Sequence, residues 1–280
     1  MDSLKRRRDR IEAHLEAVLD GTEPTQLREQ LRQVTLSGGK RVRPTLTVLV
    51  CEALDGDTEQ ATEFAVGIEL VHNASLVIDD IIDESELRRG GPSAWTAFGH
   101  GPAIVTSDGL LGEAFALFAT DRRAMRTVTE AMVHLGEGEA SELLTRPVSE
   151  TEYMQLARRK TGALFRAAAE LGAIAGDADA HTVDAFGQYA ERVGIAFQIR
   201  DDVLDATAET ERLGKPSGRD ADLDRPSIVE VTDLSPAEAN ERAHTESAGA
   251  LDALAAADIA DSQARTYLED LATFVVERER

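Results

Sequence analysis

Two groups of aspartates in the chain have the composition and spacing of a metal site. Each group has the pattern Asp-Asp-x-x-Asp, and the residues are Asp79, Asp80, Asp83, Asp201, Asp202 and Asp205. On a helix, positions one and four residues apart lie within about one turn, so the carboxylates of a group would repel one another unless a cation lay among them. Ligand sets made only of oxygen favour Mg²⁺ or Mn²⁺ over zinc, and Mg²⁺ usually completes its shell with water and phosphate oxygens. The pattern therefore predicts magnesium sites that bind a phosphorylated ligand.

Each group lies at the end of an apolar stretch with helical spacing. Residues 69–83 contain neither Pro nor Gly and carry apolar side chains at Leu70, Val71, Leu76 and Val77, which predicts one buried helix. The second group likewise follows an apolar helical run that begins near Phe197. In an acid-rich chain one such pattern can arise by chance, but two with the same apolar lead-in indicate a function.

Short basic breaks elsewhere could bind the phosphates. Residues 37–44 read Ser-Gly-Gly-Lys-Arg-Val-Arg-Pro and precede a helix expected over about 44–54, so backbone amides, helix dipole and cations could hold a diphosphate there. Five residues after Asp83, Arg88 and Arg89 precede Gly-Gly-Pro, and arginine binds phosphate oxygens through two parallel hydrogen bonds. Alone, the two segments could equally be a solvated linker and an exposed basic loop.

Lysine is rare in this chain, which makes each lysine informative. Only Lys5, Lys40, Lys160 and Lys215 occur among 30 basic residues. Lys160 lies in an otherwise apolar helix, where it is either an anion ligand or a side chain that snorkels to the surface, and its rarity favours the ligand. Lys215 belongs to a Gly-rich basic loop at 214–220 that is suited to act as a lid.

Composition limits the class of protein. The 280 residues are 42% hydrophobic and 4% aromatic, which favours a large helical core, and the net charge of −22 disfavours nucleic acid or an anionic membrane as partner. Acid-rich, lysine-poor surfaces suit a cytoplasm at very high salt, where charge repulsion is screened, so we expect a halophilic prokaryote. Cys51 is the only cysteine, and no apolar run approaches the length of a membrane span. We expect a cytoplasmic protein without stable membrane insertion.

Helical patterns cover most of the sequence, and no stretch alternates like a strand. The pattern predicts a single all-α domain over 1–280. The expected helices are 4–20, one after Pro24, 44–54, 69–83, 103–119, 124–145, 150–176, 180–206 and 236–279.

Taken together, these motifs resemble those of the trans-isoprenyl diphosphate synthase family, and within it the geranylgeranyl diphosphate synthases. The resemblance runs from about Gly38 to Arg225 and returns weakly over Ser262 to Arg278. The paired Asp motifs carry it, with Gly-Gly-Lys-Arg-x-Arg-Pro before them and Arg-Arg-Gly between them. It implies an isoprenoid-synthase helical bundle with a central substrate cavity, a homodimer, and head-to-tail condensation of isopentenyl diphosphate with an allylic prenyl diphosphate.

The resemblance also implies a role for each motif residue. The six aspartates would hold three Mg²⁺ ions on the allylic diphosphate. Arg88, Lys160 and Lys215 would contact that same diphosphate, with Thr161 and Gln198 lining the reacting end. The diphosphate of isopentenyl diphosphate would be bound by Lys40, Arg43, His72 and Arg89. Metal and cations would neutralise charge as the allylic C–O bond breaks, and the released diphosphate would be the base, so no nucleophilic side chain is needed.

In this family the product grows along the first Asp-rich helix toward its N-terminus, and a bulky residue stops it. One helical turn advances about 5.4 Å, close to one extended isoprene unit. Ala74 and Ser75 are small, and Val71 and Ile68 come next. This predicts a product of twenty carbons or more, with Phe64 or a residue of another helix closing the tunnel.

The sequence departs from the family pattern at four positions. Ile78 and Trp95 stand where histidine is usual, Arg225 where a second lysine is usual, and Glu142 where Gln or Asp is common. The segment after Val229 is short and lacks the usual proline.

Three other functions remain as alternatives. A class I terpene synthase shares the fold and the first Asp motif, but it needs no isopentenyl site. A non-catalytic partner subunit that binds prenyl diphosphate would be expected to have lost an Asp motif. An acidic helical scaffold gives no account of the lysines at 40, 160 and 215.

Overall fold

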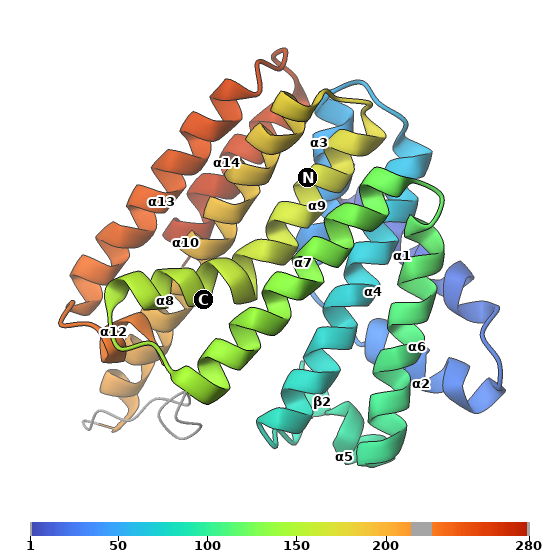
Figure 1. Cartoon of the computed structure of the whole chain (residues 1–280), viewed down its shortest axis with the longest axis horizontal. Helices are drawn as coiled ribbons and strands as arrows, with labels where there is room; N and C mark the ends of the chain where they lie inside the picture. The colour runs from blue at the N-terminus through green and yellow to red at the C-terminus, as the bar shows by residue number, and fades with distance from the viewer. Residues whose placement is uncertain (1, 214–225, 279–280) are drawn as a thin grey trace.

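The computed structural model describes residues 2–213 and 226–278, which form a bundle of helices (Figure 1). The predicted loop with Lys215, and Arg225, lie outside the described residues. The helices are α1 (Asp2–Asp20), α2 (Thr25–Thr35), α3 (Val42–Ala53), α4 (Thr58–Ile82), α5 (Ala94–Phe98), α6 (His100–Phe118), α7 (Arg122–Ala140), α8 (Glu150–Ala157), α9 (Ala163–Ala175), α10 (Ala180–Leu213), α12 (Ile228–Val231), α13 (Pro236–Ala256) and α14 (Gln263–Glu277). The expected all-α class is confirmed.

Helix α4 lies in the middle of the bundle and contains the first Asp motif. Its apolar residues from Ala61 to Val77 are buried except Leu76, which lines the cavity described below, and α3, α6 and α9 pack around it. Four polar side chains, Thr62, Glu69, Asn73 and Asp80, are buried with them. Buried polar groups need hydrogen-bond partners, so α4 has to bring specific partners to these positions.

The break after α4 is a small β-hairpin that the sequence did not predict. Strands β1 (Leu87–Arg88) and β2 (Gly91–Pro92) pair antiparallel, and Arg89 and Gly90 between them both have positive φ. Two consecutive residues of positive φ give the turn whose twist matches a two-residue hairpin. Arg88 therefore lies on a strand and Arg89 in the turn, with their side chains separated.

Two π-helical turns interrupt the helices around the centre of the bundle. η1 (Ser141–Thr145) follows α7, and η2 (Arg158–Gly162) joins α8 to α9. Such turns are frequent at functional sites because the extra residue redirects side chains. η1 carries Glu142, and η2 carries Lys160 and Thr161.

The expected helix over 236–279 is wrong, because the structure has two helices there. α13 begins with a capping box of Ser235 and Glu238. The chain then turns after Ala256, Asp258 takes a positive φ, and the Ser262 hydroxyl caps the start of α14. Neither Gly nor Pro marks this break. In the part of the chain that the structure describes, no helix is both long and apolar enough to cross a membrane.

Candidate active site

A cavity of about 600 Å³ lies between α4, α7, α10 and η2. Carboxylates line it from both sides: Asp79 from α4, Glu139 and Glu142 from α7 and η1, and Asp201, Asp202 and Asp205 from α10. Cations of the basic breaks line the same cavity, namely Lys40, Arg41, Arg43, Arg88, Arg89 and Lys160. The fold therefore brings together both Asp motifs and most of the expected cations.

Within the first Asp motif, the structure separates the three aspartates. Asp79 lines the cavity, whereas Asp80 is 2% exposed and lines a second, smaller cavity beside the hairpin. Arg88 donates from Nε to Asp80 Oδ1 at 2.9 Å and forms a second bond to it from Nη2. Asp83 caps the end of α4. Arg88 thus neutralises Asp80, and Asp79 is the aspartate of this motif that faces the cavity.

In the second Asp motif, Asp202 is held by its neighbours. Its carboxylate accepts hydrogen bonds from the hydroxyl of Tyr153 (2.6 Å), the amide of Gln198 (2.9 Å) and the backbone N–H of Ile228 (2.9 Å). Asp202 is 4% exposed, while Asp201 and Asp205 are more open. These bonds tie α8, α10 and α12 together, so Asp202 fixes the wall that carries its two neighbours.

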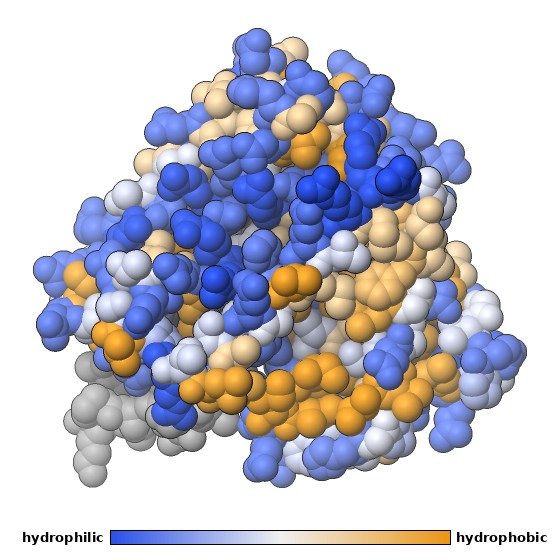
Figure 2. Space-filling view, in the orientation of Figure 1, coloured by the Kyte–Doolittle hydropathy of each residue, from blue (hydrophilic) through white to orange (hydrophobic). Residues whose placement is uncertain are grey.

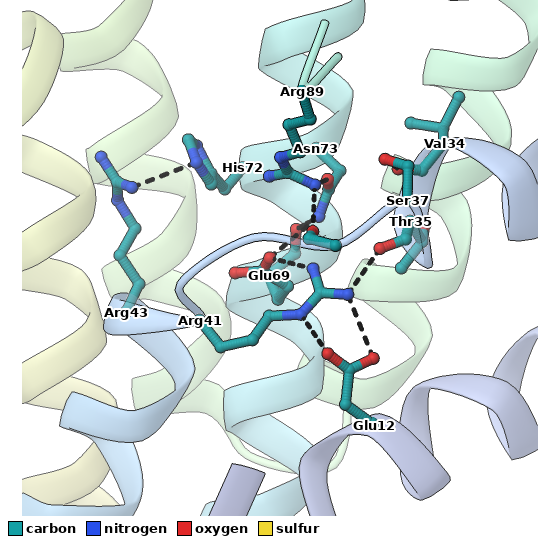
Figure 3. A network of polar contacts seen from close by, with 11 residues as sticks. Glu12, Val34, Thr35, Ser37, Arg41, Arg43, Glu69, His72, Asn73 and Arg89 are labelled. Carbon is teal, nitrogen blue, oxygen red and sulfur yellow. Dashed lines mark hydrogen bonds and ion pairs between the residues drawn. The ribbon is translucent and has the colours of Figure 1, made fainter. Parts of the chain in front are cut away.

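Arg43 and His72 form one part of the basic wall of the cavity, and their side chains contact each other (Figure 3). Arg43 donates from Nη1 to His72 Nε2 at 3.1 Å, and its guanidinium lies 4.5 Å from the centre of the Phe165 ring. Burial and the nearby arginines lower the pKa of His72 well below its usual value, so the imidazole is neutral and accepts at Nε2. Burial also lowers the pKa of Arg43 to about 10, and its buried Nε–H has no hydrogen-bond partner among the described residues. A buried unpaired donor beside a cavity is the feature expected where an anionic ligand binds.

A second set of bonds holds Arg89 in place (Figure 3). Glu69 on α4 accepts from Arg41 Nη1 at 2.6 Å and from the Asn73 amide. The Asn73 oxygen accepts from Arg89 Nη1 at 3.3 Å, and Arg89 also donates to the Gly38 carbonyl at 2.7 Å. At Gly39, whose φ is +126°, a Cβ atom would lie 3.1 Å from the Arg89 guanidinium carbon. The glycines of the 37–44 turn therefore let the loop pack directly against Arg89.

Arg41 is a structural residue of this turn. Its side chain is fully buried and also binds Glu12 and the Thr35 carbonyl. From the sequence, Arg41 was one of the cations of this turn that could hold a diphosphate, but its side chain is instead used up by partners within the protein. This structural role could not be predicted, because its partners on α1, α2 and α4 are far apart in the sequence.

Lys160 lies between two acidic side chains that sequence reasoning did not assign to the site. It is ion-paired with Glu142 and lies 3.3 Å from Glu139. Burial lowers the pKa of Lys160, but these carboxylates outweigh it and the pKa is raised, so Lys160 is charged. Burial, reinforced by Asp79, raises the pKa of Glu139 to about 7, and its buried Oε1 has no hydrogen-bond partner in the part of the chain that the structure describes. Lys160 thus extends from η2 to a partly unsatisfied carboxylate beside Asp79.

The remaining expected residues lie around the same cavity. Thr161 donates to the Gln198 side-chain oxygen at 2.8 Å, and both residues line the cavity. Lys40 lines it as well. Of the departures from the family pattern, Glu142 is the partner of Lys160, and Trp95 donates to the Ser85 carbonyl and contacts the His100 ring. Ile78 is half-buried on α4.

The expected chain-length residues lie at different depths. Ser75 lines the cavity, whereas Ala74, Val71 and Ile68 are buried in the core and do not line it. The Ser107 hydroxyl of α6 donates to the Ala74 carbonyl. Further down α4, the Phe118 ring of α6 lies so close to Gly67 that a Cβ there would come within 2.5 Å of it, and it contacts the Phe64 ring.

The donor set fits a hard cation such as Mg²⁺, but the ligands are not preassembled. Among the described residues, no three His, Cys, Asp or Glu side chains are grouped closely enough to hold an ion. The carboxylates instead face one another across the cavity, so oxygen atoms of a ligand would have to complete any metal site.

Comparison with known proteins gives one consistent answer. The family model for polyprenyl synthetase matches residues 24–264. The geranylgeranyl diphosphate synthase of Methanosarcina mazei is 34% identical over 230 residues, covering 79% of this chain and 71% of that protein. The geranylfarnesyl diphosphate synthase of Aeropyrum pernix is 34% identical over 259 residues, covering 83% and 81%. The solved geranylgeranyl pyrophosphate synthetase of Geoglobus acetivorans superposes with a TM-score of 0.83 at 31% identity, covering 98% and 99%.

Proposed function

Because this chain belongs to the polyprenyl synthetase family and is a prenyltransferase, we propose that it condenses isopentenyl diphosphate with an allylic prenyl diphosphate to make geranylgeranyl diphosphate or a longer product. The observation that carries this proposal is that one cavity is lined by carboxylates from both Asp motifs, by cations of both basic breaks and by Lys160. A reaction between two diphosphates needs carboxylates and cations in one cavity. The carboxylates bind one diphosphate through metal ions, the cations bind the other directly, and the two diphosphates have to lie side by side.

The allylic diphosphate would bind between the two Asp motifs with Mg²⁺, in the family three ions, and Mn²⁺ could replace it. Of the four aspartates that line the cavity, Asp79, Asp201 and Asp205 are the best candidates to hold the ions, because Asp202 is nearly fully buried and bound by its protein neighbours. Asp80 and Asp202 would contribute by positioning their neighbours: Asp80 binds Arg88, and Asp202 binds Tyr153. When bound, the ions would neutralise the charge that develops on the leaving diphosphate. Lys160 would add a charge-assisted hydrogen bond to the same group.

Isopentenyl diphosphate would bind at the wall formed by Lys40, Arg43, His72 and Arg89. Arg43 supplies the unpaired Nε–H, and Arg89 is held in place through Asn73. Thr161 and Gln198 would line the reacting end, and the released diphosphate would take the final proton. This cation wall favours a synthase over a terpene cyclase or a scaffold, since neither of these needs it.

We propose that Phe118 closes the product tunnel. Gly67, against which it packs, lies twelve residues before Asp79, or about 18 Å along α4 at the usual helical rise. At about 5 Å per extended isoprene unit, this depth accommodates a chain of about twenty carbons. Val71 and Ala74 lie between Gly67 and Asp79 on α4, and both are buried in the core. The deep part of the tunnel would therefore have to open as the product grows.

A homodimer is supported by an exposed apolar surface. Ile104 and Val105 on α6, Val133 on α7 and Leu143 and Leu144 on η1 are 45–81% exposed. In Figure 2 apolar side chains gather along the lower edge of this face. Exposed apolar patches of this kind usually mark an interface.

The composition supports a cytoplasmic protein of a halophile, so the experiments below use molar KCl. One core cluster contains buried residues from α1 to α14, which supports a single domain.

The test measures diphosphate release from farnesyl diphosphate with Mg²⁺, in the presence and absence of isopentenyl diphosphate. A synthase releases diphosphate only when isopentenyl diphosphate is present, whereas a cyclase releases it from farnesyl diphosphate alone. Arg43→Gln should raise the KM for isopentenyl diphosphate and leave that for the allylic substrate nearly unchanged. The matched control is Arg126→Gln, since Arg126 is an exposed arginine of α7 that forms an ion pair with the exposed Glu130. No release under either condition would contradict the proposed function.

A further inference from the structure

A buried arginine directly after α14 contacts the second Asp motif. Arg278 Nη2 donates to Asp201 Oδ1 at 2.5 Å and to the Phe197 carbonyl at 3.1 Å. Its guanidinium lies 3.9 Å from the centre of the Phe197 ring, and its side chain is only 4% exposed. The charge is therefore enclosed by protein on the side away from the cavity.

The backbone of Arg278 is held as firmly as its side chain. Arg200 donates from Nε (3.1 Å) and Nη2 (2.8 Å) to the Arg278 carbonyl, and from Nη1 to the Asn240 side chain on α13. Three helices thus hold the guanidinium beside Asp201. A guanidinium anchored in this way cannot easily withdraw when another cation approaches.

Two cations would compete for the Asp201 carboxylate: the Arg278 guanidinium and a metal ion in the cavity. Its side chain is 41% exposed and lines the cavity, but one of its two oxygens is already bound by Arg278. A divalent cation on the other oxygen would lie within a few ångströms of the guanidinium. At so short a separation, and with the guanidinium buried, salt screens their repulsion only in part. Burial raises the pKa of Asp201, and Arg278 offsets this only in part.

We propose that Arg278 is a positioning residue that compensates the charge of Asp201 before substrate binds and so makes divalent-cation binding at the second Asp motif depend on a bound diphosphate. The inference rests on the proposed function, because it takes Asp201 as a metal ligand. A diphosphate brings several negative charges into the cavity, which outweigh the single charge of Arg278 and restore the attraction for a cation. The order of binding would then be diphosphate with its cation, never the bare cation first.

The experiment measures binding of Mn²⁺ to the substrate-free protein in molar KCl, from the electron paramagnetic resonance signal of free Mn²⁺. Arg278→Met removes the charge but keeps an apolar side chain over Phe197, and Arg278→Gln is a second variant in case one does not fold. Each should bind Mn²⁺ about tenfold more tightly than the wild type, since a like charge beside the ion is removed. Arg278→Lys should bind like the wild type.

Two controls separate this electrostatic effect from a loss of packing. Arg200→Gln removes the anchor of the Arg278 backbone while the guanidinium remains, so it should lower the unfolding midpoint without tightening Mn²⁺ binding. Adding Asp201→Asn to Arg278→Met should abolish the gain in affinity. Unchanged or weaker Mn²⁺ binding in both charge-removing variants overturns the proposal. The Mn²⁺ experiment does not measure turnover, so its result is independent of the diphosphate-release test above. If the variants bind Mn²⁺ more tightly but the wild type transfers no prenyl group in that test, the proposed function is refuted and this inference stands.

Discussion

Replacing Arg41 with methionine is expected to lower the free energy of unfolding by about 4 kcal/mol, because the substitution strands a buried charge. Arg41 is fully buried, and its partner Glu69 has a side chain that is only 3% exposed. Removing one member of a buried ion pair usually costs about 3–5 kcal/mol, since the remaining charge stays desolvated. The lost bond to the Thr35 carbonyl adds about 1 kcal/mol, and the remaining partner, Glu12, is more exposed and contributes less.

The double variant Arg41→Met/Glu69→Gln isolates the cause. Without the glutamate charge no buried ion is stranded, so the cost should fall to about 1–2 kcal/mol. The control is Arg32→Met, since Arg32 binds Asp20 at 2.7 Å but the pair is exposed. Its loss should cost less than about 1 kcal/mol. The assay is denaturant unfolding of all three variants in molar KCl.

The same variants link the network to substrate binding. Glu69 holds Asn73, and Asn73 holds Arg89, so Arg41→Met should also raise the KM for isopentenyl diphosphate. A cost of Arg41→Met below that of Arg32→Met, or no recovery in the double variant, would refute the reasoning.

Three further predictions concern the cavity. Gly138→Ala should destabilise the protein by about 2 kcal/mol and lower kcat, because its Cβ would lie 2.8 Å from the backbone nitrogen of Lys160, whereas Gly136→Ala on the same helix has open space and should be neutral or stabilising. Glu139→Gln should gain stability over the wild type as pH rises from 5 to 8, by up to about 3 kcal/mol. The folded-state pKa of Glu139 is raised to about 7, so the wild type loses stability as this buried group ionises. Phe118→Ala should lengthen the product by one or more isoprene units.

Each of these predictions has a clear contrary result. Equal unfolding midpoints and kcat for Gly138→Ala and Gly136→Ala would mean that α7 does not position η2. A stability difference between Glu139→Gln and wild type that stays constant over this pH range would show that Glu139 does not titrate there. An unchanged product length in Phe118→Ala would place the tunnel floor elsewhere.

The elements that carry the chemistry were predictable from sequence because local patterns encode them. The apolar period before Asp79 fixes α4, and the same pattern before Asp201 fixes α10. The basic turns could be recognised because Gly and Arg occur together beside helix ends. That the two Asp-rich helices and the basic turns meet at one cavity is not encoded by any local pattern. This expectation came from the resemblance to a known family.

Other features depend on tertiary contacts that spacing does not record. Asp80 and Asp202 have the same motif positions in their two groups, yet Arg88 binds one and Tyr153 the other. The Asp201–Arg278 contact joins residues 77 positions apart. The break after Ala256 was missed because its positive φ falls on Asp258 rather than on a glycine. Glu139 was not assigned to the site from the sequence, although its position could have indicated it. It is an acidic residue one helical turn before Glu142, on the face toward Lys160.

The most direct test of the account is mass spectrometry of the products made from isotopically labelled isopentenyl diphosphate and farnesyl diphosphate, with Mg²⁺ in molar KCl. The account predicts a prenyl diphosphate of about twenty carbons that carries the label, and no such product from the Arg43→Gln variant at low isopentenyl diphosphate. Folded protein that binds farnesyl diphosphate but forms only unlabelled hydrocarbon, or no product at all, would contradict it.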